Sequence, residues 1–311
     1  MRVFKVGQGN FILLTKDDKA LVVDCGNCSG LLSNESYTAE IYSAFSKIKC
    51  CKIVVTHDHD DHYNGIDSLI KAIKEINQDI PFNVYQNTTN YLNGACLGWH
   101  DKNLIEGYLN NFLDDVTFTV IKPDDFSETW LNPDDPHQNN LVLKVTYKNK
   151  SILLPGDAGV FLFAHHCINT PNFLNLFSDV VAFVLPHHGS LKNGEQFWFA
   201  QLIRNANCMY PLCIISSDPE TSHQLPRKEY IDKILGRFGN FSDAISHDIS
   251  CFNGKNVKTL KTLENIFITS CANSCCYTVI IKDDGDVELF DGSTLLFKGF
   301  PFQFDSDCNT M

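Results

Sequence analysis

The sequence predicts an α/β fold in which two mixed β-sheets pack face to face and helices cover their outer faces. Short apolar runs rich in β-branched residues recur along the chain, and such runs are typical of buried strands. Longer segments between them carry apolar residues at helical spacing, as in 65–76. The 311 residues are 44% hydrophobic and 20% charged, which is enough for one layered core. We therefore expect a single domain over 1–311.

The expected elements follow one another in the order of a layered domain. Strands are expected at 3–6, 10–15, 19–24, 52–56, 80–86, 116–121, 140–147, 150–154, 180–185 and 211–216. Helices are expected at 35–47, from 65 onward, at 101–114, within 161–177, at 193–203 and at 226–237. Near the end of the chain, a hairpin is expected to join 277–281 to 286–290 through Lys282-Asp283-Asp284-Gly285, because this sequence favours a tight turn.

The most informative segment is Thr56-His57-Asp58-His59-Asp60-Asp61-His62, which directly follows the strand-like run Ile53-Val54-Val55. A polar loop that leaves the end of a buried strand brings its side chains close together. His57 and His59 can turn their imidazoles toward one cation, while Asp61 and His62 can serve a second cation beside it. The alternative is a solvated polar loop without function. The density of histidine and aspartate favours half of a two-metal site.

The spacing His-x-His-x-Asp-His after a short apolar strand resembles the signature of the metallo-β-lactamase fold superfamily of hydrolases. Asp24 ends an earlier strand-like run, and His137, Asp157 and His188 follow the signature in the order of that family. Asp157 ends Ile152-Leu153-Leu154-Pro155-Gly156-Asp157, which has the Gly-Asp that the family uses to bridge its metals. The resemblance implies a metallo-β-lactamase-like αββα sandwich.

Three further segments resemble the ComEC-type branch of this superfamily, the hydrolase domain of bacterial competence channels and its free-standing relatives. They are Val6-Gly7-Gln8-Gly9-Asn10, Gln138-Asn139-Asn140-Leu141-Val142-Leu143 and His187-His188-Gly189-Ser190. A weaker likeness is Ile214-Ile215-Ser216-Ser217 with a downstream His-Gln-Leu-Pro. The resemblance is clearest over 1–235 and fades beyond it.

The resemblance also implies how the ligands are shared. One metal ion would be held by His57, His59 and His137 and the other by Asp61, His62 and His188, with Asp157 as the bridge. Nitrogen and oxygen ligands without thiolate fit zinc, the ion that we favour, and also manganese or iron. A water between two such cations loses a proton near neutral pH and becomes the nucleophile, so the expected reaction is hydrolysis with Asp61 closest to that water.

Several of these positions have a second interpretation. Asp24 is expected to assist catalysis by orienting a ligand histidine, or else to cap a strand end. His137 is displaced by one position from the commoner pattern, so it is either a ligand or a bystander. His187 is taken as the neighbour of the ligand His188, although the two could be exchanged. His223 is expected to steady a phosphate or protonate a leaving group, or to be an exposed loop residue.

Three classes of function follow. The ComEC-type resemblance implies a phosphodiesterase or nuclease that acts on a small phosphodiester or on single-stranded nucleic acid. The formal net charge of −12 and the presence of four arginines argue against a broad basic surface for nucleic acid. The alternative is a lactonase, esterase or thioesterase that acts on a small neutral metabolite. The third class, a non-catalytic binding module, is disfavoured by the complete ligand set.

The sequence also predicts a soluble cytoplasmic protein that has no membrane partner. It begins without a charged-then-apolar leader, and its longest apolar stretches are too short to span a bilayer. The 13 cysteines are odd in number, and most of them, including Cys167, Cys208 and Cys213, are expected in apolar surroundings where a free thiol packs as a small hydrophobe, so we expect reduced thiols. Cys25-Gly26-Asn27-Cys28 leaves a second zinc site or a redox pair open as a weaker alternative.

Overall fold

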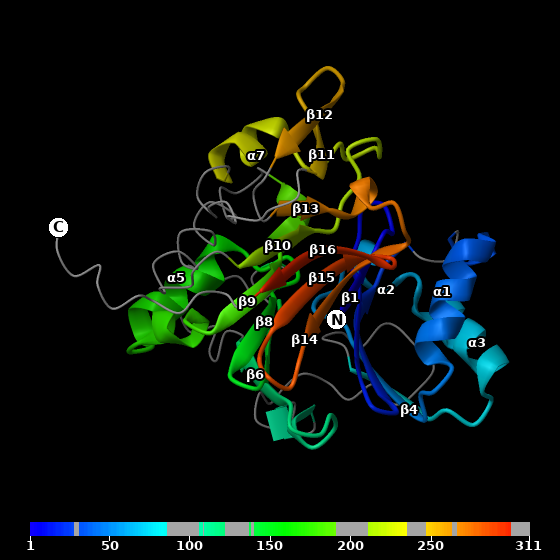
Figure 1. The fold of residues 1–311 in the computed structure, drawn as a ribbon. Coiled ribbons are helices and arrows are strands. Elements are labelled where there is room, and N and C mark those ends of the chain that lie inside the picture. Colours follow the sequence, from blue (N-terminus) through cyan, green and yellow to red (C-terminus); the bar gives the residue numbers. More distant parts are fainter. Residues whose placement is uncertain are drawn as a thin grey trace.

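The protein consists of two large β-sheets with helices on their outer faces (Figure 1), so the predicted α/β sandwich is confirmed. The computed structural model describes residues 1–27, 31–85, 106–107, 109–121, 137, 140–190, 211–234, 247–262 and 266–299. The helix expected at 193–203 lies outside the described residues, and so does part of the one expected at 101–114.

The first sheet has eight strands in the order β16-β15-β14-β1-β2-β3-β4-β5. Their bounds are β1 Arg2–Phe4, β2 Phe11–Lys16, β3 Lys19–Cys25, β4 Cys50–Val54, β5 Phe82–Tyr85, β14 Cys276–Ile281, β15 Val287–Asp291 and β16 Thr294–Gly299. The pairs β3–β4 and β4–β5 are parallel, and the remaining pairs are antiparallel. Because β14 pairs with β1, the last part of the described chain completes the sheet that the first residues begin.

The second sheet has six strands in the order β13-β10-β9-β8-β7-β6. Their bounds are β6 Thr117–Ile121, β7 Val142–Tyr147, β8 Lys150–Leu154, β9 Val180–Val184, β10 Leu212–Ile215 and β13 Ile266–Ile268. Strands β8, β9, β10 and β13 run parallel to one another, while β6, β7 and β8 are joined in antiparallel pairs. A separate hairpin of β11 (His247–Phe252) and β12 (Val257–Thr262) lies at the top of Figure 1.

The core between the sheets is built by alternate residues of their strands, because successive side chains of a strand point to opposite faces. In β3, Leu21 and Val23 pack in this central core with Leu143 and Leu154 of the second sheet. Their neighbour Val22 instead packs in a separate cluster on the outer face. Alternate residues of one strand therefore pack into the central core and against the helices on the outer face.

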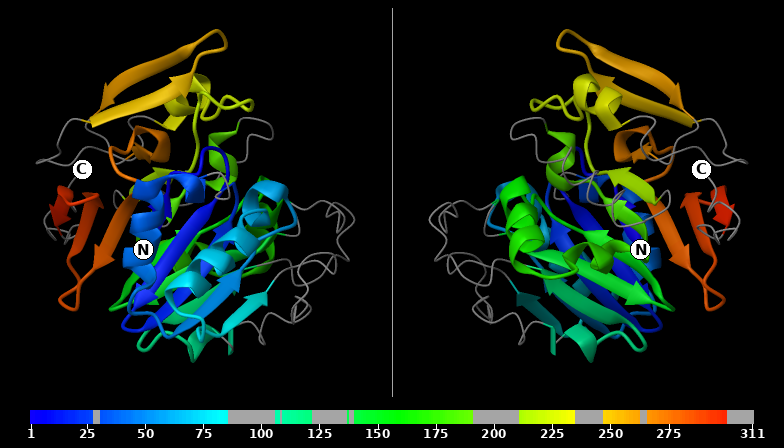
Figure 2. Two further views of the ribbon diagram at one scale, coloured as in Figure 1. Left: turned by 90° about the vertical axis from the view of Figure 1, so that its right-hand side faces the viewer. Right: turned by 90° about the vertical axis from the view of Figure 1, so that its left-hand side faces the viewer.

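Helices close both outer faces (Figure 2). On the first sheet they are α1 (Glu35–Phe45) and α3 (Ile66–Ile76), whose buried residues share a cluster with the strands. On the second sheet, residues of α5 (Val160–Asn169), of the 3-10 helix η2 (Phe173–Phe177) and of α7 (Lys228–Ile234) do the same. Short elements complete the described chain: α2 Asp60–Tyr63, η1 Leu31–Ser33, η3 Pro186–Gly189 and η4 Thr269–Cys271. No helix in the described part of the chain is long and apolar enough to cross a lipid bilayer.

The structure departs from the sequence-based expectations in three places. Strands β11, β12, β13 and β16 were not expected. Helix α7 begins at Lys228 rather than at 226, because the Arg227 backbone forms a β-bridge with Phe252. Cys167 is exposed, so its predicted apolar environment is wrong, whereas Cys213 is a buried free thiol as expected.

Candidate metal centre

The candidate site lies where the carboxyl ends of parallel strands from both sheets meet. Strands β3 and β4 lead into the loops at 26 and 56–62, and β8, β9 and β10 lead into the loops at 155–159, 186–190 and 216. Loops at this edge of a sheet are the usual place for functional side chains, because the strands fix where each loop starts. The predicted ligands therefore come from separate loops but share one edge of the sandwich.

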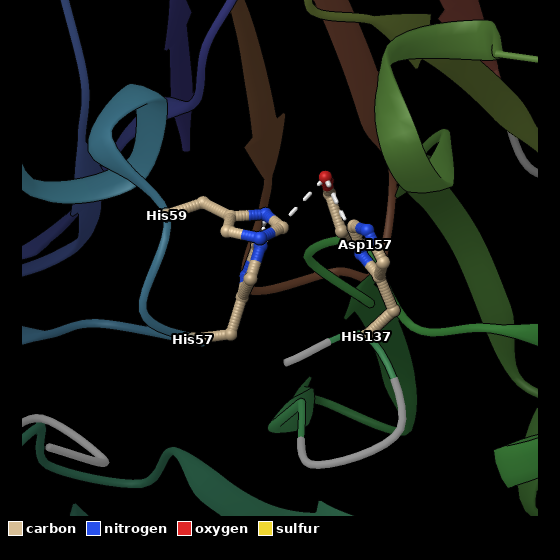
Figure 3. A group of neighbouring side chains, drawn as sticks. All are labelled: His57, His59, His137 and Asp157. Atoms are coloured by element: carbon tan, nitrogen blue, oxygen red, sulfur yellow. Dashed lines mark hydrogen bonds and ion pairs between the residues drawn. The ribbon is translucent and has the colours of Figure 1, made fainter. Parts of the chain in front are cut away.

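Four predicted ligands form one group, which we call the first ligand group. His57, His59, His137 and Asp157 each offer one ligand atom, and these atoms all lie within 4.8 Å of one another. Figure 3 shows the carboxylate of Asp157 facing the three imidazoles. The distance from Asp157 Oδ2 is 3.7 Å to His57 Nε2 and 4.0 Å to His137 Nδ1. This arrangement brings His137 to the position that a ligand would need.

The other three predicted ligands form the second ligand group: Asp61, His62 and His188. Their ligand atoms also lie within 4.8 Å of one another. Asp61 Oδ2 lies 3.3 Å from His188 Nε2. The His62 and His188 side chains are fully buried, whereas 26% of the Asp61 side chain is exposed. Asp61 is therefore the member of this group that solvent reaches.

Asp157 lies between the two groups. Its Oδ1 is 3.2 Å from His62 Nε2 and 3.6 Å from His188 Nε2, while its Oδ2 faces the first ligand group. One carboxylate therefore presents one oxygen to each group. This is the geometry of a bridging ligand, the role that the sequence resemblance implied for this residue.

Two histidines of the second ligand group have their ring orientation fixed by partners behind them. The Nδ1 of His62 lies 2.7 Å from Asp24 Oδ2, and the Nδ1 of His188 donates to the Ser216 carbonyl at 2.8 Å. When Nδ1 carries the proton, Nε2 is left with its lone pair for a cation. Asp24 therefore lies where a residue that orients a ligand histidine has to lie.

Thr56 connects this network to the strand that carries the signature. Its backbone N–H and its hydroxyl both donate to the carboxylate of Asp24, at 2.7 and 2.9 Å. Asp24 is fully buried and has a φ of 58°, a left-handed conformation that costs energy for a residue other than glycine. The hydrogen bonds to Thr56 and His62 stabilise it there.

The residues of the site fit divalent cations. Within the described part of the chain, His62 Nε2, His188 Nε2 and Asp157 Oδ1 are buried and form no hydrogen bond of good geometry, although Asp157 Oδ1 lies 3.2 Å from His62 Nε2 and 3.6 Å from His188 Nε2. A buried polar atom left unsatisfied costs about 1–3 kcal/mol, and a cation among these atoms would remove that cost. The ligands are imidazole nitrogens and carboxylate oxygens, which suit zinc, manganese or iron.

The electrostatics of the cluster favour ionised carboxylates. Burial alone would raise the pKa of Asp157, but the neighbouring His62 and His188 outweigh it and hold that pKa well below its usual value. The same balance lowers the pKa of Asp61, where burial is opposed by the contact with His188, whose Nε2 lies 3.3 Å from Asp61 Oδ2. Burial, followed by the charge of His62, lowers the pKa of His57 well below its usual value. Ionised carboxylates and a neutral imidazole at His57 are the forms that bind cations. At His62, burial alone would lower the pKa, but the carboxylates of Asp157 and Asp24 outweigh it and raise the pKa, so a cation there would have to displace a proton.

The turn that carries Asp157 is held by a residue to which the sequence analysis gave no role. The amide of Asn140, which is fully buried, donates to the Pro155 carbonyl at 2.6 Å and accepts from the Asp157 backbone N–H at 3.0 Å. Gly156 has a φ of 57°, and a Cβ there would stand 2.5 Å from Asn140 Oδ1 and from Thr56 Oγ1. Asn140 and Gly156 together place the bridging carboxylate.

The structure places His187 and His223 outside both ligand groups. His187 Nε2 lies 3.8 Å from Asp157 Oδ2, and its ring centroid lies 4.5 Å from that of His137. His223 is exposed, and it shares with His187 the lining of a neighbouring pocket that also contains Arg227. Sequence reasoning did not single out Arg227 for the site, because an isolated arginine at the start of a helix carries no signal of its own.

The comparisons with known proteins agree with this geometry. Residues 4–77 match the family model described as the metallo-beta-lactamase superfamily, and no curated protein matches the chain. The match runs from the last residue of β1 through α3, including the signature, and it supports this superfamily. Together with the histidine–aspartate cluster, it supports a metal-dependent hydrolase that uses divalent ions and whose substrate is unspecified.

Similar solved structures include a protein from Parabacteroides distasonis that is provisionally named a metal-dependent hydrolase. It is 15% identical over 75% of this chain and 88% of its own, with a TM-score of 0.42. The metallo-β-lactamase MIM-1 from Novosphingobium pentaromativorans is 13% identical over 66% of this chain and 79% of its own, with a TM-score of 0.34.

We predict that Gly26→Ala removes metal from the second ligand group. A Cβ at Gly26 would stand 1.6 Å from the Asp61 carbonyl oxygen, so the loop that carries Asp61 must move. Bound metal per chain should fall in elemental analysis, and the thermal unfolding temperature should fall as well. Gly107→Ala is the matched control, because a Cβ there meets nothing within 4 Å. Normal metal content in Gly26→Ala would contradict this account of the loop.

A second prediction concerns Asp24→Asn. The amide offers one acceptor oxygen in place of two, so either the Thr56 N–H or the His62 Nδ1 loses its partner. Metal affinity, measured by competition with a coloured chelator, should fall about 10–100-fold. Asp79→Asn makes the same change of charge at an exposed position and should leave the affinity unchanged. Equal affinities in the two variants would show that Asp24 does not act through His62.

Proposed function

We propose that this chain is a two-metal hydrolase of phosphodiesters, with zinc as the favoured ion and manganese or iron as alternatives. The observation that carries the proposal is the position of Asp157, whose two oxygens face two separate ligand groups. Two cations held side by side are the usual arrangement for displacement at phosphorus, because they can stabilise the attacking and the leaving oxygen together.

The ions and the residues of the second ligand group have distinct parts in this proposal. The bound ions would lower the pKa of a coordinated water and offset the charge that develops on the scissile group. Asp61 is the solvent-exposed member of its group, so its carboxylate can hold and orient the attacking water. The buried histidines His62 and His188 are held rigidly by Asp24 and Ser216, which limits reorganisation during the reaction.

The surroundings of the site favour an anionic substrate over a neutral one. The pocket beside it presents the imidazoles of His187 and His223 and the guanidinium of Arg227. Although the chain has a net charge of −12, the described lining of this pocket combines one guanidinium and two imidazoles with a single carboxylate, that of Glu229. A lactonase, esterase or thioesterase for a neutral metabolite would gain nothing from this arrangement.

The closer resemblance to the ComEC-type branch supports the same reaction class. Its motif residues Gly9, Asn140 and Ser216 contact the site loops: Gly9 accepts a hydrogen bond from Ser216 Oγ at 2.6 Å, and Asn140 holds the Asp157 turn. We propose a small phosphodiester or a short single strand as the substrate, His223 as a residue that steadies its phosphate, and the cytoplasm as the place of action.

We predict that the purified protein, loaded with zinc or manganese, hydrolyses bis(p-nitrophenyl) phosphate and that Asp61→Ala reduces turnover about a hundredfold or more. The loss of a ligand that also holds the attacking water removes several kcal/mol of transition-state stabilisation. The variant should retain part of its metal, because the first ligand group is intact. Release of p-nitrophenolate and elemental analysis measure the two effects.

Asp60→Ala is the matched control, since Asp60 is the exposed neighbour of Asp61 and belongs to neither ligand group. Near-normal turnover by Asp61→Ala would contradict the assignment of the second ligand group. Rapid hydrolysis of a neutral lactone or thioester, without phosphodiesterase activity under zinc, manganese or iron, would instead establish the alternative function.

A further inference from the structure

A pocket of about 340 Å³ adjoins the candidate metal centre. His187 belongs to both places: it lines the pocket, and its Nε2 lies 3.8 Å from Asp157 Oδ2. The remaining wall comes from Gln8, from Ser190 and from the segment that carries His223 and Arg227, with Phe252 of the β11–β12 hairpin. The volume is at the small end of the range of ligand pockets, which suits a group the size of a nucleotide or less.

Arg227 supplies a guanidinium that the described protein leaves without a carboxylate partner. The acceptor of its hydrogen bond is Gln224 Oε1 at 3.4 Å, and no carboxylate of the described residues forms an ion pair with it. Arg2, the other described arginine, is paired with Glu40 at 3.2 Å. A guanidinium has five N–H donors in a planar fork that matches the oxygens of a phosphate, so Arg227 keeps donors for a ligand.

The guanidinium is held in place by the hairpin. Its central carbon lies 5.1 Å from the centre of the Phe252 ring, at a distance typical of a cation–π contact. The backbones of Arg227 and Phe252 form a β-bridge, and the Phe252 N–H donates to the Pro226 carbonyl at 3.0 Å. An arginine whose stem and backbone are fixed in this way loses little entropy when it binds an anion.

The segment of Arg227 also touches the loop of the metal ligands. Gly189 follows His188 directly, and a Cβ at Gly189 would stand 2.8 Å from Pro226 Cβ. The absence of a side chain lets the 186–189 turn and the segment of Arg227 pack against each other.

We propose, on the basis of the phosphodiesterase function above, that this pocket binds a second, terminal phosphate of the substrate. The substrate class is then a small phosphodiester with a phosphate next to the scissile group, such as a 5′-phosphorylated dinucleotide. Arg227 binds the terminal phosphate through its guanidinium, and the exposed imidazole of His223 contributes a further donor. His187 stands between this phosphate and the metal centre.

The charged residues of the pocket predict in which direction each substitution changes the affinity for phosphate. Glu229 is the one acidic residue among the described residues that line the pocket. Arg227→Gln removes the cation and should weaken phosphate binding. Glu229→Gln removes the repelling carboxylate and should strengthen it. If this segment had only a structural role, Glu229→Gln would not strengthen phosphate binding.

The experiment compares a dithymidine phosphodiester with its 5′-phosphorylated form as substrates for the metal-loaded enzyme. The wild-type enzyme should have a kcat/KM about tenfold higher for the phosphorylated form, the size of one charge-assisted contact. Arg227→Gln should abolish that preference through KM while its metal content stays unchanged. Glu229→Gln should increase the preference. Equal use of both dinucleotides by the wild-type enzyme, or an equal loss on all substrates in Arg227→Gln, would overturn the proposal.

A binding measurement separates this proposal from the proposed reaction. If no phosphodiester is hydrolysed, calorimetry with thymidine 5′-monophosphate and with thymidine still tests the pocket of the metal-loaded protein. Tighter binding of the monophosphate that is lost in Arg227→Gln would retain the phosphate site and reject only the reaction. Binding of the monophosphate that does not change in Arg227→Gln would reject the site.

Discussion

The structure depends above all on one buried carboxylate, that of Asp157, which is surrounded by imidazoles from the loops of both sheets. A buried charge is costly unless it is paired, and the loss of a partner typically costs about 3–5 kcal/mol. Asp157 is 2% exposed, and its two oxygens face His62 and His188 on one side and His57 on the other. The loops at this edge are therefore held to a geometry in which two cations can share one ligand.

The rest of the site keeps that geometry by fixing the residues behind the ligands. Asp24 and Thr56 tie the ends of β3 and β4 to His62, Ser216 ties the end of β10 to His188, and Asn140 holds the turn after β8. Two further hydrogen bonds join segments of the two sheets: the Leu141 N–H donates to the Thr56 carbonyl at 2.9 Å, and the Ser216 hydroxyl donates to the Gly9 carbonyl at 2.6 Å. The packing of the sandwich and the position of the ligands are therefore parts of one network. The chemistry then requires only the ions and one ligand, Asp61, that solvent can reach.

The ligands could be predicted from the sequence because they follow strands whose apolar character is clear, and because their order resembles that of a known superfamily. His137 was the least secure of them, and its ring lies with His57, His59 and Asp157. The contacts that support the ligands were harder to predict from the sequence. The contact of Gly26 with the Asp61 carbonyl depends on how two loops meet in space, which no local pattern shows. The β11–β12 hairpin was missed because its second strand carries lysine and threonine instead of an apolar alternation.

The central claim is that two metal ions lie side by side and share Asp157. Electron paramagnetic resonance of the manganese-loaded protein, with the metal content measured on the same sample, tests it directly. The account predicts close to two ions per chain and a spectrum of spin-coupled pairs, because a shared carboxylate keeps the ions within a few ångströms of each other. One ion per chain, or two ions without spin coupling, would contradict it.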